Sequence, residues 1–497
     1  MNVARFLQRA HQHYTSKPLC TFENVELPLS DFSRAVAVLS RRMMDAGAAK
    51  GSRIAVLISN RPELLVGLFA IWTIGGVAVP INPALAVPEV RAIVGHCEPT
   101  IVLAEDNLSH VLSGCAPGFE LFIVDRNSAS KNETAASSPA ICPTASTDPA
   151  LIYYTSGTTG TPKGAVISHG AVAATAGMFA DHLMIGPMDR LLITGPMAFI
   201  LHLTMNALTA ISNGASIVIL EKFKPDVAIE AINRHKITVL IAVPTAYTMM
   251  LNFLEGRRMT LPSVRLGISA GAAFPEALSK RIQDCLGLSV FDVWGMTECG
   301  PITTYDPRRE RRGQPDSCGR TLPSCHIRIV DDGFKDLAVG EVGEVILRSP
   351  GLMTGYYKNP RATAEAISDG WMRSGDLGRV DADGLLYIVG RKKDMIVRGG
   401  ANIYPVDIEE VLYSHDAVGE CAVVGVPDPL FGEIVKAFVV LRDGRTLHPS
   451  DLVEYCRTRV AEYKVPSQIE ITKSLPKGAT GKILRRQLRD MDARTTL

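Results

Sequence analysis

Apolar and polar positions follow a repeating pattern over the first four-fifths of the chain. Short uninterrupted apolar runs, typical of buried strands, are followed by longer apolar or amphipathic segments that suit helices. One succession passes from an expected strand at 53–58 through a helix at 62–74, with Pro62 near its first turn, to a strand at 77–81. The same alternation recurs around 215–220 and 238–243. It predicts parallel sheets covered by helices.

The pattern changes in the last third of the chain. After Glu341 the apolar runs become shorter and are separated by glycine turns, and a compact segment begins after Arg391. That segment predicts a helix at 406–413, strands at 420–426 and 437–441, and a helix at 452–460. About a hundred residues suffice for a small domain. We therefore expect an α/β protein: a large N-terminal domain of parallel or mixed sheets flanked by helices, and a small α+β C-terminal domain.

Bulk properties narrow the class of protein. A chain of 497 residues is too long for one core. The net charge of +1 offers no global field for nucleic acid, and the 10 cysteines show no zinc-ligand spacing, so we expect reduced thiols and a cytoplasmic protein. The most apolar stretch, 64–81, contains Gly75, Gly76 and Pro80. It suits a buried helix and strand better than a transmembrane segment.

A loop rich in glycine, serine and threonine follows the apolar run 150–154. Small residues let a backbone approach phosphate, hydroxyl groups add hydrogen-bond donors, and a lysine adds positive charge. A flexible linker would not follow a strand in this way. The residues expected to hold ATP phosphates here are Thr155, Ser156, Gly157, Thr158, Thr159, Gly160 and Lys163.

This loop is not the GxxxxGK[ST] phosphate loop, because glycine follows Lys163. It closely resembles the signature of the adenylate-forming superfamily, which includes acyl-CoA synthetases, luciferases and the adenylation domains of peptide synthetases. The resemblance covers most of the chain, since further motifs occur in the family's order. It implies that ATP and Mg²⁺ activate a carboxylic acid as acyl-AMP, and that CoA then accepts the acyl group.

Residues 291–298, Phe-Asp-Val-Trp-Gly-Met-Thr-Glu, resemble the family's YGxTE motif, with tryptophan in place of the usual tyrosine. The resemblance implies that Thr297 contacts the α-phosphate and that Glu298 ligates Mg²⁺, for which a carboxylate oxygen is suitable. The other residues expected to contact ATP in this motif are Asp292, Val293, Trp294, Gly295 and Met296.

Two further segments resemble nucleotide-binding motifs of the family. Residues 269–275 resemble the small-residue loop beside adenine and supply Gly271, Ala272 and Ala273, although Ala270 and Ala273 depart from the frequent glycine and proline. Residues 371–377 resemble the TGDL motif. There, Asp376 is implied to accept both ribose hydroxyls, and Arg391 to reach ribose or phosphate.

The C-terminal motifs imply a moving domain. Residues 476–485 resemble the family's lysine motif, which makes Lys482 the residue that stabilises charge during adenylation. Lys393 matches the hinge position. The expected division is therefore 1–390 for the ATP and acyl domain, 391–393 for the hinge and 394–497 for the mobile domain. The loop 398–405 is implied to replace Lys482 in the second step, with Gly399, Gly400 and Tyr404 beside CoA.

The expected acyl pocket is apolar. Amino-acid-activating relatives place an aspartate in the region that corresponds to 195–206, which here contains no acid, and a buried ammonium group would lack a partner. Relatives that activate acetate have tryptophan at the position of Gly295, so this pocket should extend further. The expected pocket residues are Met197, Ala198, Phe199, Ala270 and Gly295, with Ala198 and Phe199 replacing a frequent Phe-His pair.

We therefore expect an AMP-forming acid–CoA ligase. Fatty acids and aryl acids both remain open as substrates. Two other activities also stay open: loading of a carrier protein by a stand-alone adenylation enzyme, and a luciferase-like monooxygenase. The sequence is compatible with a homodimer but does not establish one.

Overall fold

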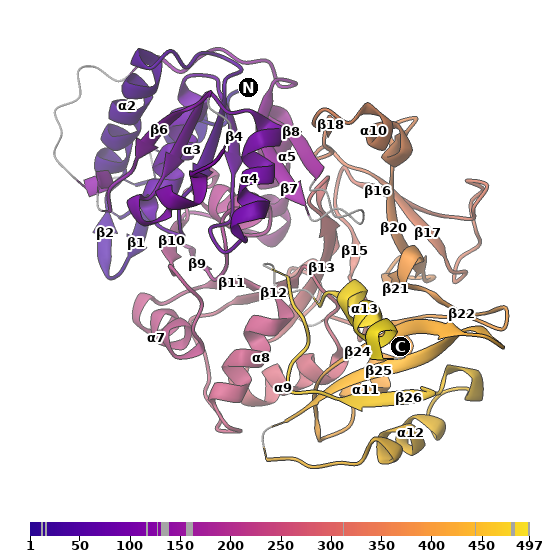
Figure 1. Cartoon of the computed structure of the whole chain (residues 1–497). Coiled ribbons are helices and arrows are strands. Elements are labelled where there is room, and N and C mark those ends of the chain that lie inside the picture. The colour runs from indigo at the N-terminus through magenta and orange to yellow at the C-terminus, as the bar shows by residue number, and fades with distance from the viewer. Residues whose placement is uncertain are drawn as a thin grey trace.

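The structure is a computed structural model that describes residues 1–10, 13–14, 17–115, 118–126, 128–130, 139–155, 163–311, 313–442, 444–478 and 483–495. Across these residues, the strands form four sheets in the expected α/β architecture (Figure 1). Two large sheets form the N-terminal region. A third sheet follows them in the chain, and the fourth belongs to a smaller C-terminal domain.

The first large sheet has the order β18-β8-β7-β4-β3-β5-β6. Its central strands are parallel, whereas β7 and β8 form an antiparallel pair, as do β8 and β18. Parallel strands are buried on both faces, which explains their continuous apolar runs. Its strands are β3 (Arg53–Leu57), β4 (Val77–Pro80), β5 (Ile101–Ala104), β6 (Glu120–Ile123), β7 (Pro149–Thr155), β8 (Lys163–Ser168) and β18 (Gly355–Tyr356).

The second large sheet has the order β15-β14-β13-β12-β11-β9-β10-β1-β2. It is parallel from β1 to β13 and ends in antiparallel strands, of which β14 follows β13 directly in the chain. Its strands are β1 (Cys20–Phe22), β2 (Val25–Leu27), β9 (Arg190–Ile193), β10 (Ser216–Ile219), β11 (Val239–Ala242), β12 (Leu266–Ala270), β13 (Val290–Met296), β14 (Gly300–Thr304) and β15 (Arg320–Thr321).

Helices lie between the two large sheets and on their outer faces. One core cluster joins the inner faces of both sheets through α2, α3, α5 and α6, and two other clusters bury the outer faces against α4 and against α7, α8 and α9. The helices are α1 (Arg5–Ala10), α2 (Leu29–Asp45), α3 (Pro62–Thr73), α4 (Val87–Cys97), α5 (His169–Leu183), α6 (Thr209–Ser212), α7 (Pro225–His235), α8 (Pro244–Phe253) and α9 (Glu276–Leu286).

The third sheet joins the large sheets to the C-terminal domain. Its order is β16-β17-β20-β19, and β21 also pairs with β20. Its elements are β16 (His326–Val330), β17 (Gly343–Arg348), β19 (Ile367–Ser368), β20 (Trp371–Val380), β21 (Leu386–Arg391) and the short helix α10 (Pro360–Ala366).

The C-terminal domain has its own sheet, β23-β22-β25-β24, with β26 parallel to β25. Two buried clusters cover its faces, and α13 lies against β24 (Figure 1). Its elements are β22 (Ile396–Arg398), β23 (Ala401–Ile403), α11 (Pro405–Tyr413), β24 (Val418–Asp428), β25 (Gly432–Leu441), α12 (Pro449–Arg457), β26 (Gln468–Ile471) and α13 (Arg485–Thr495).

The apolar stretch at 64–81 folds as the sequence predicts. Every residue of α3 is buried, and β4 lies in the centre of the first sheet. Among the described residues, no helix is both long and apolar enough to cross a membrane. All ten cysteines are free thiols, and most of them are buried.

Candidate active site

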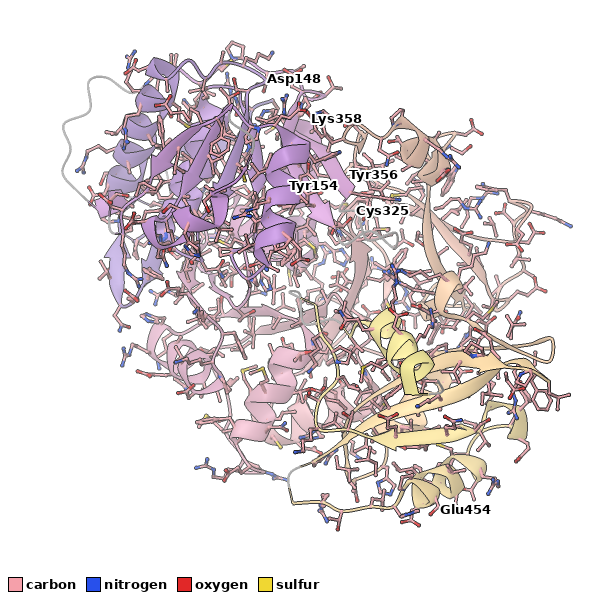
Figure 2. The ribbon with its side chains drawn as sticks, in the orientation of Figure 1. Asp148, Tyr154, Cys325, Tyr356, Lys358 and Glu454 are labelled. Atoms are coloured by element: carbon pink, nitrogen blue, oxygen red, sulfur yellow. The ribbon has the colours of Figure 1, made fainter. Side chains whose placement is uncertain are left out.

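Glu298 contacts the hydroxyl of Tyr356, and Lys163 lies over the ring of the same tyrosine. Glu298 lies between β13 and β14 and is 8% exposed. Its Oε1 accepts a hydrogen bond of 2.9 Å from the hydroxyl of Tyr356, the last residue of β18. The Nζ of Lys163, the first residue of β8, lies 5.2 Å from the centre of the Tyr356 ring. Figure 2 labels Tyr356 beside Tyr154, and β18 pairs with β8 there.

Tyr356 was not among the residues singled out from the sequence. Burial and the neighbouring Glu298 raise the pKa of its hydroxyl, so it remains a hydrogen-bond donor to the carboxylate. Its only signal in the sequence is the Gly355-Tyr-Tyr357 run, which carries no motif. The contact joins residues 58 positions apart and depends on the pairing of β18 with β8.

Parts of two expected loops lie outside the described residues. These are Ser156, Gly157, Thr158, Thr159 and Gly160 of the glycine-rich loop, and the C-terminal Lys482. The ends of the first loop are described. Thr155 ends β7, Lys163 begins β8, and the two residues pair in the antiparallel ladder. The glycine-rich segment therefore joins two adjacent strands, as its position after an apolar run predicts.

The expected ribose ligand, Asp376, lies on β20 and is 7% exposed. Its Oδ2 accepts a hydrogen bond of 2.9 Å from the indole Nε1 of Trp294, and its Oδ1 lies 3.1 Å from Nε of Arg391. The structure thus brings together three residues from separate motifs, on β13, β20 and the end of β21. Thr297 follows β13 directly and is partly buried.

Gly295 has no room for a side chain. The register between β13 and β14 shifts between Trp294 and Gly295. A Cβ atom at Gly295 would lie 2.2 Å from the carbonyl oxygen of Gly300 and 2.9 Å from Cα of Pro301. Both contacts are with backbone, so no side-chain rotation can relieve them. The close approach of β14 therefore requires glycine at position 295, next to Thr297 and Glu298.

We expect Gly295→Ala to destabilise the protein by about 2–4 kcal/mol, because the methyl group must displace the backbone of β14. The matched control is Gly177→Ala on α5, where nothing lies within 4 Å of the added Cβ. This control should be neutral or slightly stabilising. Urea unfolding midpoints measure both. Equal midpoints for the two variants would contradict the close approach of β13 and β14.

Asp292 has a buried carboxylate oxygen without a hydrogen-bond partner among the described residues. It pairs with Ser269 across β12 and β13, and its Oδ1 has no hydrogen-bond partner. Burial raises the pKa of Asp292 to about 7, and the thiol of Cys318, hydrogen-bonded to it, opposes that shift. The orphaned oxygen suits a ligand donor such as the amino group of adenine, which fits its expected place in the ATP site.

Because the folded pKa of Asp292 is raised, its ionisation opposes folding. The unfolded state loses this proton near pH 4 and the folded state near pH 7, so stability falls as pH rises between them. We expect Asp292→Asn to gain stability over the wild type as pH rises from 5 to 8, by about 1–2 kcal/mol. Thermal unfolding across this range, without nucleotide, tests it. The exposed Asp383→Asn is the control, and a gain that does not change with pH would contradict the prediction.

The loop expected to lie beside adenine follows β12. Ala270 ends β12 and is 4% exposed, whereas Ala272 and Ala273 are exposed. Gly271 has a φ of +91°, a conformation that glycine adopts without strain. The side chain of Leu201 lies 4.0 Å from the place of a Cβ on Gly271, which brings the expected adenine loop close to the expected acyl segment.

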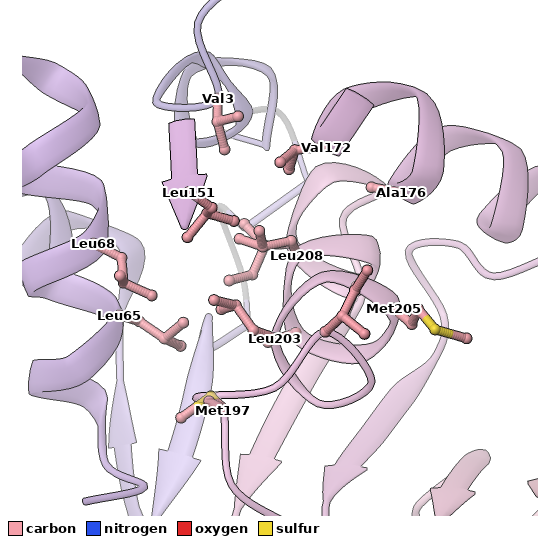
Figure 3. Close-up of a cluster of buried hydrophobic side chains, with 14 of the residues drawn as sticks. Val3, Leu65, Leu68, Leu151, Val172, Ala176, Met197, Leu203, Met205 and Leu208 are labelled. Carbon is pink, nitrogen blue, oxygen red and sulfur yellow. The ribbon is translucent and has the colours of Figure 1, made fainter. Parts of the chain in front are cut away.

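The expected acyl segment is only partly accessible. Phe199 is partly exposed, Ala198 is 6% exposed, and Met197 has no exposed surface because it packs in the central core (Figure 3). The Met197 side chain is therefore part of the central core. Asn60 holds the segment: its side chain accepts from the Met197 N–H at 2.9 Å and donates to the Gly195 carbonyl at 2.7 Å.

A π-helix (Leu203–Leu208) follows this segment, with bonds from the Met205 N–H to the Ile200 carbonyl and from the Ala207 N–H to the His202 carbonyl. Such π-turns are frequent at functional sites. His202 packs so tightly that a Cβ on Gly195 would lie 2.3 Å from its Nε2. Burial lowers the pKa of His202 to about 4. The segment from Gly195 to Asn206 is therefore uncharged near neutral pH.

The C-terminal domain begins at a short turn. The turn η4 (Lys392–Asp394) follows β21, and Lys393 is exposed within it. Asp394 lies 3.3 Å from the Nη2 of Arg489 on α13. The expected CoA residues lie close behind: Gly399 and Gly400 form a turn with positive φ between β22 and β23, and Tyr404 precedes α11. They lie far along the chain from Glu298 but directly after the expected hinge.

The residues present fit a Mg²⁺ ion that arrives with ATP. The Glu298 carboxylate is buried with one neutral hydrogen-bond donor and, among the described residues, no ion-pair partner. A buried carboxylate without a cation is costly, and a magnesium ion would supply that charge. Within the described ranges there is no cluster of three or more metal-binding side chains. Mg²⁺ commonly takes one or two carboxylates, with phosphates and waters as its other ligands.

Family comparisons match nearly the whole chain. The AMP-binding enzyme family matches residues 6–357, and the AMP-binding enzyme C-terminal domain matches 407–482. Feruloyl-CoA synthase from Amycolatopsis is 34% identical over 93% of this chain and 93% of its own. Indoleacetate–CoA ligase from Aromatoleum aromaticum is 33% identical over 100% and 99%. A long-chain-fatty-acid–CoA ligase from Bacillus subtilis is 31% identical over 96% and 92%.

Solved structures agree over the same length. The anthranilate CoA ligase AuaEII in complex with anthranoyl-AMP has a TM-score of 0.93 at 27% identity, covering 100% of this chain and 98% of its own. ATP-bound MatB from Rhodopseudomonas palustris has a TM-score of 0.91 at 28% identity, and apo MatB has 0.80 at 27%, each covering 99% of both chains.

Proposed function

Since this chain belongs to the AMP-binding enzyme family and is an AMP-forming acid–CoA ligase that uses ATP, Mg²⁺ and CoA, we propose that its acid is an uncharged aryl or arylalkyl carboxylic acid. The observation that carries this proposal is the wall from Gly195 to Asn206, which has no charged side chain and contains a neutral His202.

An uncharged wall disfavours two kinds of acid. A dicarboxylic acid would bury its second carboxylate without a cation, and an amino acid would bury an ammonium group without an anion. Phe199 supplies a partly exposed ring against which an aryl tail can pack, and the small side chain of Ala198 precedes it. The relatives named for ferulate and indoleacetate support the same class.

Fatty acids are the second candidate. The same apolar wall suits an alkyl chain, and relatives named for long-chain fatty acids match most of this chain. A hydrophobic pocket discriminates weakly between tails of similar size, so the difference must be measured.

Formation of AMP and acyl-CoA with Mg-ATP tests the proposal across hydroxycinnamic, indoleacetic, phenylacetic, octanoic, palmitic and malonic acids and phenylalanine, with and without CoA. We expect kcat/KM for the best aryl acid to exceed that for the fatty acids by about tenfold or more. Preference for palmitate would establish the second candidate. Activity with malonate or phenylalanine would contradict the uncharged wall. ATP–pyrophosphate exchange without any CoA product would indicate a carrier protein as acceptor.

The described arrangement of the two domains suits the first half-reaction. The chain resembles ATP-bound MatB more closely than apo MatB, with TM-scores of 0.91 and 0.80. In this proposal Lys482 reaches the acid and α-phosphate, Thr297 contacts the α-phosphate, and Asp376 and Arg391 hold the ribose. Rotation of residues 394–497 about Lys393 then brings Gly399, Gly400 and Tyr404 to the pantetheine arm of CoA. Because its substrates ATP and CoA are intracellular, we place the enzyme in the cytoplasm.

A further inference from the structure

Trp294 does more than supply an aromatic ring. Its side chain is 8% exposed, and its indole N–H, a group that needs a partner when buried, donates to Oδ2 of Asp376 at 2.9 Å. The bond links β13 of the large sheet to β20 of the third sheet, across 82 positions of sequence. A tyrosine, the usual residue here, has its only donor at the far end of the ring and lacks an N–H at this place.

Both oxygens of Asp376 are therefore held from the protein side. Oδ2 accepts from Trp294, and Oδ1 lies 3.1 Å from Nε of Arg391. A carboxylate offers about four acceptor sites, so each oxygen keeps one for a further donor. Two anchors on opposite oxygens also fix the rotation of the carboxylate about its last bond. In that state it can receive two neighbouring hydroxyl groups at once.

We propose that Trp294 is a positioning residue that orients Asp376 for the 2′- and 3′-hydroxyls of the ATP ribose. This inference rests on the proposed role of Asp376 in the adenylation site. The indole thus acts through Asp376, and its loss should weaken the part of nucleotide binding that depends on the ribose hydroxyls. A residue that acted only by stacking on adenine would affect all adenine nucleotides equally.

Nucleotide binding tests the inference without a carboxylic acid. Calorimetry with AMP and 2′-deoxy-AMP gives a discrimination ratio for the wild type, for Trp294→Phe and for Asp376→Ala. We expect the wild type to bind AMP about tenfold more tightly than 2′-deoxy-AMP, as for loss of one hydrogen bond to a charged group. Trp294→Phe, which keeps a ring but has no N–H, should weaken AMP binding about five- to tenfold and reduce the ratio to about twofold.

The double variant provides the decisive comparison. If Trp294 acts through Asp376, adding Trp294→Phe to Asp376→Ala should change the ratio no further. Trp294→Tyr, also without the indole N–H, should behave like Trp294→Phe and serves if that variant folds poorly. If Trp294→Phe and Trp294→Tyr both weakened AMP and 2′-deoxy-AMP equally, the ratio of the two affinities would stay at its wild-type value. That result would overturn the inference. Because no acid is present, failure of the proposed substrate class leaves this result unaffected. A wild type that does not distinguish the two nucleotides would overturn the role of Asp376 and this inference together.

Discussion

Glu298→Gln should lower the rate of acid-dependent ATP–pyrophosphate exchange by about 10³-fold, the largest effect that we expect from a single substitution. Glutamine keeps the size of the side chain and an acceptor for the Tyr356 hydroxyl, but it removes the negative charge. Glu298 is 8% exposed and has no ion-pair partner among the described residues. Its charge is therefore available for the magnesium that accompanies ATP.

Stability separates this loss from misfolding. Removing an uncompensated buried charge should leave the unfolding temperature unchanged or raise it, so an inactive Glu298→Gln that melts no lower than the wild type supports a role in catalysis. Raising the Mg²⁺ concentration should partly restore its activity. Tyr356→Phe, which removes only the hydrogen bond of 2.9 Å, should cost about three- to tenfold.

The matched control for Glu298→Gln is Glu365→Gln. Glu365 is 63% exposed and pairs with Arg361 on the surface of α10. Surface pairs contribute little, so this variant should retain full exchange activity. If Glu298→Gln also retained it, Glu298 would not ligate the metal, and the resemblance of residues 291–298 to the family motif would not extend to its function.

The sequence predicted the elements whose burial is complete. Strands β3, β4, β10 and β11 lie within a residue or two of their expected ranges, because parallel strands buried on both faces appear as short apolar runs. The same holds for α3, where Pro62 occupies the first turn. The antiparallel bulge at Gly295 has no comparable signal, since it depends on how β14 returns beside β13.

The motifs predicted individual site residues but not the contacts between them. The motifs identified Glu298, Asp376 and Trp294, whereas the partners Tyr356 and Asn60 carry no pattern, because each meets its partner only after distant strands and loops have packed. Met197 shows the converse limit. Its apolar side chain suited a pocket, yet it is fully buried in the core, and hydrophobicity alone does not distinguish these two positions.

Lys482→Ala should slow the first half-reaction, formation of the adenylate, and leave the second half-reaction, transfer to CoA, nearly unchanged. A lysine that stabilises the charge developing on the carboxylate and α-phosphate contributes only to formation of the adenylate, so this step should slow by about 10²–10³-fold. Transfer of the acyl group from supplied acyl-AMP to CoA should change less than about threefold. The described residues on either side of 479–482 are paired: Lys477 and Ile483 form a β-bridge, and Arg485 donates to both carboxylate oxygens of Glu409 at 2.7 and 2.8 Å.

Single-turnover assays measure the rate of each half-reaction separately. Lys473→Ala provides the control, because Lys473 is an exposed lysine of the same segment and should leave both steps unchanged. Equal losses in both half-reactions for Lys482→Ala would contradict its assignment to the first step. They would also remove the chemical reason for the domain rotation, since a lysine needed throughout has no cause to leave the site between the two steps.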